Sequence, residues 1–170
     1  MQNLVLTRID DRLIHGQVMT AWIKERKATQ VVIVDDGTAN DDYMIEVLEM
    51  AIPEEIAIGI FTKEDGVRFF SRPLSEPTIL LVKGPEALNY LVDAGIHIEE
   101  IDVGGMGSRK NRSVLYKNIS ASPEERMTFQ ELVNKGVKVF VQVMPKDKPT
   151  DITKYGSGAN SVRDDHLTSY

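Results

Sequence analysis

The segment RIDDRLIHGQ, residues 8–17, places opposite charges around a single imidazole directly after the first apolar run of the chain. A histidine in such a position can act as a nucleophile or as an acid–base group. If a helix begins near Gly16, its free N–H groups and positive dipole end point toward the same place. The segment therefore predicts chemistry on a small anion such as phosphate, with His15 at its centre.

A second basic segment, GGMGSRKNR, covers residues 104–112. Its glycines allow backbone N–H groups to approach an anion closely. We expect this segment and the histidine segment to be neighbouring loops, because both follow predicted strands whose carboxyl ends share one edge of a sheet. The basic side chains that the two loops contribute are Arg8, Arg12, Arg109, Lys110 and Arg112.

Each of these features also has a simpler explanation. A single loop histidine usually has no special role, and Asp10 with Arg12 could form an ordinary surface ion pair. The GGMGSR segment lacks the spacing of a dinucleotide fingerprint, and the chain contains no GxxxxGK[ST] motif. Asp35 and Asp36 could hold Mg²⁺, but acceptance of backbone N–H bonds in a turn is the favoured interpretation. Three scattered histidines do not predict a zinc site.

Strands and helices alternate along the chain. Residues 30–36, QVVIVDD, form a run typical of a strand that is buried on both faces. Residues 16–27 carry an apolar stripe of helical period, and residues 122–136 begin with a capping-box pattern. The alternation predicts an α/β fold with an open, mostly parallel central sheet of about six or seven strands and helices on both faces.

Composition restricts the classes of protein that remain. The 170 residues predict a domain over 1–150 and a polar tail over 151–170, which we expect to be partly disordered. A net charge of −6 argues against nucleic-acid binding, and the absence of cysteine excludes thiolate chemistry. We expect no signal peptide and no membrane span, which makes the cytoplasm the expected location.

Residues 8–23, RIDDRLIHGQVMTAWI, closely resemble the active-site loop of the enzyme IIB components of the bacterial sugar phosphotransferase system, mannose–fructose–sorbose family. The resemblance continues through VVIVDD, IDVGGMGSR and VFVQVMP and covers about residues 1–150. Two positions depart from the family pattern. Asp102 stands where the family often has Asn, and Met144 precedes Pro145 where the family often has Val.

The resemblance implies a phosphoryl carrier. Such a protein is a protein-histidine phosphotransferase, which accepts a phosphoryl group from phosphorylated IIA and passes it to a sugar held by the membrane components IIC and IID. The resemblance implies that His15 is phosphorylated on Nδ1, that no metal or organic cofactor takes part, and that the protein associates peripherally with the inner face of the membrane through IIC and IID.

Physical chemistry gives each neighbouring residue an expected role. Phosphoryl transfer needs positioning and charge stabilisation, and the guanidinium of Arg12 can bind phosphate oxygens in a planar fork. We expect Asp10 to orient Arg12, and the N–H groups of Gly16 and Gln17 to bind the remaining oxygens. The expected docking residues for the partner are Arg8, Arg109, Lys110 and Arg112.

Two alternatives from other classes remain open on the sequence. One is a receiver-like signalling domain phosphorylated on Asp35 or Asp36. The other is a module that binds a phosphate or a nucleotide without chemistry. The sequence favours a hexose or an amino sugar only weakly, and it leaves the oligomeric state undetermined.

Overall fold

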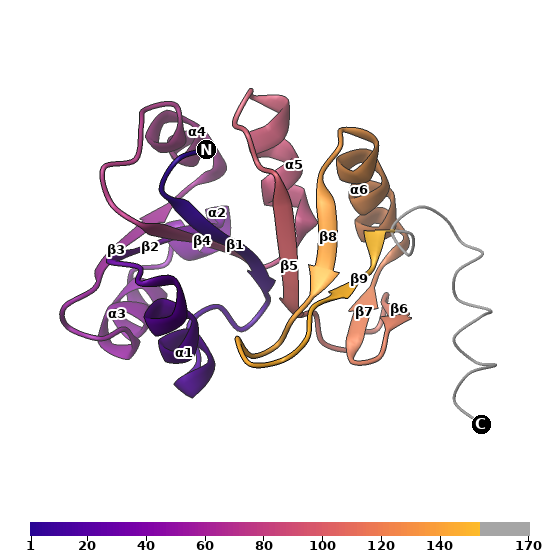
Figure 1. The fold of residues 1–170 in the computed structure, drawn as a ribbon, viewed down its shortest axis with the longest axis horizontal. Helices are drawn as coiled ribbons and strands as arrows, with labels where there is room; N and C mark the ends of the chain where they lie inside the picture. Colours follow the sequence, from indigo (N-terminus) through magenta and orange to yellow (C-terminus); the bar gives the residue numbers. More distant parts are fainter. Residues whose placement is uncertain (154–170) are drawn as a thin grey trace.

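A seven-stranded sheet forms the centre of the protein in the computed structural model, which describes residues 1–153 (Figure 1). The strand order is β3-β2-β4-β1-β5-β8-β9, and every neighbouring pair is parallel except β8 and β9. The strands are β1 (Leu4–Asp10), β2 (Gln30–Val34), β3 (Ala57–Phe61), β4 (Thr78–Val82), β5 (Glu100–Gly105), β8 (Lys138–Val141) and β9 (Thr150–Asp151). The predicted open, mostly parallel α/β fold is confirmed.

Six helices connect the strands within residues 1–153, and the first and the last begin where the sequence predicts. They are α1 (Gly16–Arg26), α2 (Asp36–Ala39), α3 (Asp42–Ala51), α4 (Lys63–Phe70), α5 (Pro85–Asp93) and α6 (Pro123–Asn134). Ser122 and Glu125 form the predicted capping box at the start of α6. The short helix α2 was not predicted, because four residues are too few to show a period.

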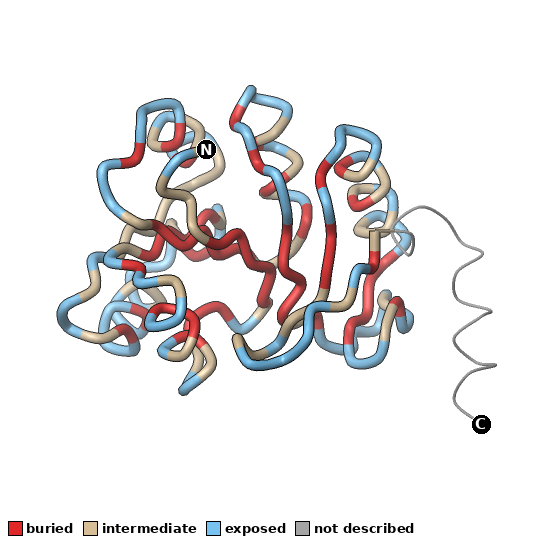
Figure 2. The backbone as a smooth tube through the Cα atoms, viewed as in Figure 1, coloured by how far each residue is buried: buried red, intermediate tan, exposed pale blue. Residues whose placement is uncertain are grey.

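Two apolar cores lie on opposite faces of the sheet. Figure 2 shows that the buried residues concentrate in its central strands. One core joins the sheet to α1 and α3, with Trp22 fully buried. The other joins it to α4, α5 and α6, with Leu88 and Phe129 at its centre. The alternate side chains of β2 and β4 point into one core or the other, which explains why these strands read as continuous apolar runs. Because these strands run parallel, their carboxyl ends lie at one edge of the sheet.

The C-terminal part of the fold differs from the prediction in two places. Residues 113–121 form an antiparallel hairpin, β6 (Ser113–Tyr116) and β7 (Ile119–Ala121), which lies outside the predicted central sheet. The sheet also continues past residue 150, because Asp151 pairs with Phe140 and Ile152 is only 1% exposed. The expected boundary at 150 is therefore too early, and the rest of the expected tail, 154–170, lies outside the described residues. In residues 1–153 no helix is long and apolar enough to cross a membrane.

Candidate functional site: an imidazole held by a buried carboxylate

The ring of His15 is fixed by a carboxylate at the end of β1. Nε2 of His15 lies 2.8 Å from Oδ2 of Asp10, whose side chain is 1% exposed, whereas the histidine side chain is 25% exposed. Burial raises the pKa of Asp10, but hydrogen bonds from Arg12 and His15 outweigh it and leave that pKa below its usual value. An ionised carboxylate only accepts hydrogen bonds, so Nε2 carries a proton, and in the neutral ring the lone pair is on Nδ1.

Arg12 is held by the same carboxylate from the solvent side. Its Nε lies 3.1 Å from Oδ1 of Asp10 and its NH2 lies 3.3 Å from Oδ2, while the backbone N–H of Arg12 also donates to Oδ1. The side chain is 56% exposed, and its NH1 makes no hydrogen bond among residues 1–153. Asp10 therefore orients both His15 and Arg12. The sequence predicted only the contact with Arg12.

Two apolar residues anchor the loop between Arg12 and His15. Leu13 and Ile14 are buried in the core under α1, although charged residues flank them in the sequence. Leu13 has a φ of +59°, a left-handed conformation that non-glycine residues rarely adopt, and its N–H donates to the carbonyl of Asp10. The loop thus turns sharply and then begins α1 at Gly16, as predicted, so that His15 stands at the first free N–H groups of the helix.

Arg8 lies inside the protein, which contradicts its expected role in docking. The side chain is fully buried: NH1 lies 2.5 Å from Oδ2 of Asp102 and 2.9 Å from the carbonyl oxygen of Gln142. The guanidinium also lies over the ring of Trp22 and 3.8 Å from Oδ2 of Asp10. Arg8 is therefore a structural cation that connects Asp102, the departure from the family pattern, to the carboxylate under His15.

The glycines of the second loop make room for these side chains. A Cβ on Gly104 would overlap the guanidinium of Arg8, and a Cβ on Gly105 would lie 2.8 Å from Oδ1 of Asp10 and 3.1 Å from NH2 of Arg12. We expected the glycines to bring N–H groups to an anion. The structure gives a different reason for Gly104 and Gly105. Without a Cβ, these residues leave room for the guanidinium of Arg8 and the carboxylate of Asp10 beside β5.

The two basic loops are neighbours, as predicted, and Asp11 connects them. Its Oδ2 accepts hydrogen bonds from the N–H of Gly107 and from NH1 of Arg112, at 2.9 and 3.0 Å, and lies 3.8 Å from NH2 of Arg109. The Arg112 side chain is 4% exposed because Glu125 binds it through two bonds of 2.8 Å. Arg112 is thus unsuited to docking through its side chain, whereas Arg109 and Lys110 are exposed. Sequence analysis missed Asp11, since nothing marked it apart from its neighbour.

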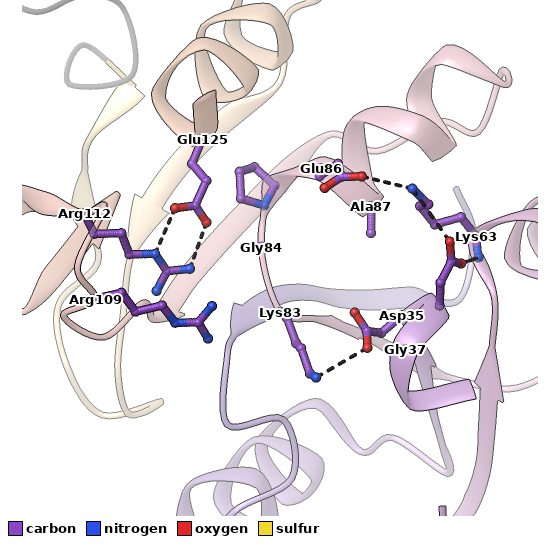
Figure 3. A pocket seen from close by; sticks show the side chains of 12 residues that line it. Asp35, Gly37, Lys63, Lys83, Gly84, Glu86, Ala87, Arg109, Arg112 and Glu125 are labelled. Atoms are coloured by element: carbon purple, nitrogen blue, oxygen red, sulfur yellow. Dashed lines mark hydrogen bonds and ion pairs between the residues drawn. The ribbon is translucent and has the colours of Figure 1, made fainter. Parts of the chain in front are cut away.

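A cleft of about 320 Å³ opens beside this region at the ends of β2 and β4 (Figure 3). Asp35 accepts the N–H and the hydroxyl of Thr38, at 2.9 and 2.6 Å, and lies 3.4 Å from Nζ of Lys83. Asp36 accepts the N–H of Lys63 at 2.7 Å. Asp35 therefore binds an N–H of its own turn, as the favoured interpretation has it, whereas Asp36 binds the first N–H of α4. No cluster of three potential metal-ligating side chains occurs in residues 1–153.

Comparison with known proteins gives the family. Residues 4–166 match the family model described as the PTS system sorbose subfamily IIB component. The chain belongs to this family. It is a sugar-specific IIB component of the phosphotransferase system, and the resemblance of residues 8–23 is confirmed.

Relatives of this IIB component differ in the sugar that their names specify. The fructose-specific EIIB component of Bacillus subtilis (strain 168) is 31% identical over 156 residues, which are 91% of this chain and 96% of that protein. The mannose-specific EIIAB component of Escherichia coli (strain K12) is 30% identical over 144 residues, 84% of this chain and 45% of that protein. The crystal structure of the IIBSor domain of the sorbose permease from Klebsiella pneumoniae aligns with a TM-score of 0.84 at 32% identity, covering 89% of this chain and 94% of that one.

Proposed function

We propose that this IIB component carries a phosphoryl group on Nδ1 of His15, taking it from a phosphorylated IIA partner and passing it to a sugar held by the membrane components IIC and IID. The single observation that supports this most is the hydrogen bond from Nε2 of His15 to Asp10, which leaves the Nδ1 lone pair available. The protein would then act in the cytoplasm, at the inner face of the membrane.

In the proposed transfer, each bond that forms at the imidazole replaces a bond that breaks. The bond between phosphorus and the histidine nitrogen of IIA breaks, its electron pair returns to that nitrogen, and Nδ1 of His15 forms the new bond. The ring keeps its proton on Nε2 and so becomes positively charged, and the buried carboxylate of Asp10 offsets that charge. In the second step a sugar hydroxyl oxygen forms a bond to phosphorus, and the bond between phosphorus and Nδ1 breaks. Its electron pair returns to Nδ1, which restores the neutral ring, and the hydroxyl proton passes to water.

The surroundings of His15 fit the charge of the transferred group. NH1 of Arg12 is available for a phosphate oxygen, and the first N–H groups of α1, at Gly16 and Gln17, lie next to the histidine in the chain. Phosphoryl transfer depends mostly on such positioning and charge stabilisation. No metal or organic cofactor enters this proposal.

The partner surface is smaller than the sequence predicts. Arg109 and Lys110 remain as exposed cations on the loop that neighbours the loop of Arg12, while Arg8 and Arg112 are occupied inside the protein. A groove of about 400 Å³ beside Arg12, lined in part by Tyr116, Val141 and Val143, adds an apolar surface. The mannose-specific relative unites A and B parts in its name, which favours IIA as the partner that docks here.

Phosphate uptake from phosphoenolpyruvate, the general system proteins and the cognate IIA tests the proposal. His15→Ala should abolish covalent uptake and leave the fold intact, whereas the exposed His97→Ala should take up phosphate like the wild type. The phosphate should be lost in acid and survive alkali. Normal labelling of His15→Ala would refute the assignment, and alkali-labile phosphate lost in Asp35→Asn would favour the receiver alternative.

A further inference from the structure

The charges of the chain are unevenly distributed. Residues 28–62 contain eight aspartates and glutamates and neither lysine nor arginine. Since the net charge of the whole chain is −6, the remaining residues carry a net charge of +2. The acidic segment runs from β2 through α2 and α3 to β3, and so occupies the β3 end of the sheet.

Helix α3 exposes an apolar stripe within this acidic segment. Tyr43, Val47 and Met50 are 73%, 40% and 86% exposed, and their spacing of four and three residues puts them on one side of the helix. Leu48 and the core lie on the other side. The carboxylates on and after the helix that take part in no ion pair within residues 1–153 are Asp42, Glu46, Glu49, Glu54 and Glu55. We call the stripe and these five carboxylates the α3 face.

The α3 face begins at the same edge of the sheet as His15. Helices α1 and α3 pack on one side of the sheet and share an apolar core (Figure 1). Helix α1 follows β1, and α3 follows β2 after the short helix α2, so both begin near the edge where the strands end. Tyr43, in the first turn of α3, therefore lies toward that edge, and Met50 lies farther from it. A partner on the α3 face could thus remain in place while another surface reaches His15.

We infer that the α3 face binds a basic, apolar segment of the membrane components, namely their cytoplasmic loops. The inference rests on the proposed function. Cytoplasmic loops of membrane proteins carry an excess of lysine and arginine, which complements the five free carboxylates. Exposed Tyr and Met are also the residue types that protein interfaces favour.

Charge argues against the other occupants. A second copy of the chain would bring the same carboxylates against one another, and like charges in an interface are costly. A lipid surface is anionic on the cytoplasmic side and would repel the α3 face. The IIA partner is expected at the cations Arg109 and Lys110, which lie outside the acidic segment.

Binding of the unphosphorylated protein to proteoliposomes that contain its own IIC and IID tests the inference. Two double variants remove one property each: Val47→Gln with Met50→Gln removes the apolar contact, and Glu46→Lys with Glu49→Lys reverses the charge. We expect each to bind about tenfold more weakly, a loss of about 1.4 kcal/mol. Raising the salt concentration should weaken wild-type binding, because exposed charges are screened.

Matched controls lie on the opposite side of the sheet, on α6. Met127 is 65% exposed and Glu124 is exposed in the first turn of that helix. Met127→Gln and Glu124→Lys should bind the proteoliposomes like the wild type. All variants should accept phosphate from phosphorylated IIA at the wild-type rate, since none of the substituted residues contacts His15 or Arg12.

Several results would overturn the inference. Unchanged binding of both double variants would exclude the α3 face, and slowed uptake from IIA with normal proteoliposome binding would assign the face to IIA. A wild-type dimer that Val47→Gln with Met50→Gln converts to a monomer would assign it to a second copy, and equal binding to protein-free vesicles would assign it to lipid. If His15 takes up no phosphate but the variants still lose proteoliposome binding, the proposed function fails while the docking surface stands.

Discussion

In the proposed phosphoryl transfer, a single hydrogen bond at His15 decides which ring nitrogen can react. Asp10 holds Nε2–H, and the same carboxylate holds Nε and NH2 of Arg12, so the nucleophile and its expected phosphate-binding group share one support. The support is buried and the two groups that it orients are partly exposed. In the proposed function, this arrangement leaves Nδ1 as the nucleophile, and the partly exposed ring can be reached by two different partners.

Replacing Arg12 with lysine separates charge from geometry. Lysine keeps the positive charge but loses the planar fork and both side-chain bonds to Asp10 in their present form. Transfer from phosphorylated IIA should slow by about 10²–10³-fold, the typical effect of losing one oriented donor to a developing charge, and it should not vanish. Stopped-flow measurement of phosphate transfer checks this, with Lys24→Arg, on the exposed side of α1, as a control. A wild-type rate in Arg12→Lys would remove Arg12 from the mechanism.

Asp102 should make stability depend on pH. Burial raises its pKa from 3.8 to about 6, although Arg8 and the N–H of Gln142 oppose the shift. Between about pH 4 and pH 6 the folded protein thus holds a proton that the unfolded chain releases, so this group lowers the free energy of unfolding as pH rises through that window.

Asp102→Asn removes that contribution while its amide can still bind Arg8 or Gln142. The wild-type free energy of unfolding minus that of Asp102→Asn should therefore fall between about pH 4 and 6 and level off above pH 7. Urea unfolding at several pH values measures this difference. Glu54→Gln, which changes an exposed carboxylate, should show no comparable fall. A difference that rises across the window would contradict the direction given for Asp102.

At the scale of elements, β5 and the loop after β1 depend on each other through close contacts. Gly104 lies against the guanidinium of Arg8, which is held by Asp102 of the same strand and by the carbonyls of Gln142 and Val143 after β8. Trp22 of α1 donates to the same Val143 carbonyl at 3.0 Å. The strand, the helix and the segment after β8 thus form one packed unit under the active loop.

Gly104→Ala should destabilise that unit severely. The new methyl group would overlap Arg8, and a buried guanidinium with four polar contacts cannot move aside without leaving charges unpaired. We expect a loss of about 3 kcal/mol or more in the free energy of unfolding, measured with urea. Gly37→Ala is the control, because a Cβ there meets only an ordinary contact of 3.6 Å. Equal stability of the two variants would show that Arg8 can relocate.

At the scale of the whole molecule, opposite charges gather at different places. The acidic segment, residues 28–62, lies toward the β3 end of the sheet, and the exposed cations Arg12, Arg109 and Lys110 lie around the loops after β1 and β5. An acidic protein can therefore present a local basic patch to one partner and an acidic surface to another. The basic patch can attract an acidic partner only at short range, because the net charge of the whole chain is negative.

Reversal of the basic patch should slow the encounter with IIA. Arg109→Glu with Lys110→Glu should reduce the association rate at low salt, and raising salt to about 0.5 M should do the same to the wild type, because charges are screened beyond about 8–10 Å even at ordinary ionic strength. The chemical step should change little. Stopped-flow transfer at several IIA concentrations separates the two. An association rate that responds to neither change would exclude steering by these residues.

The sequence by itself determined the alternation of strands and helices, the ends of α1 and α6, and the histidine loop. These features depend on local properties, namely apolar period, capping residues and an unusual run of charges, which neighbouring residues record directly. The family resemblance depends on the same contiguous residues.

Only the tertiary structure decided which charges are available. Arg8 and Arg12 look alike in the sequence, yet Arg8 is fully buried against Asp102 and Arg12 is 56% exposed. Arg112 is likewise removed from the surface by Glu125, and Ile152 joins the core from a segment that reads as a polar tail. These outcomes depend on partners 13 to 94 residues away in the chain, and burial by such distant partners leaves no periodic signal in the sequence.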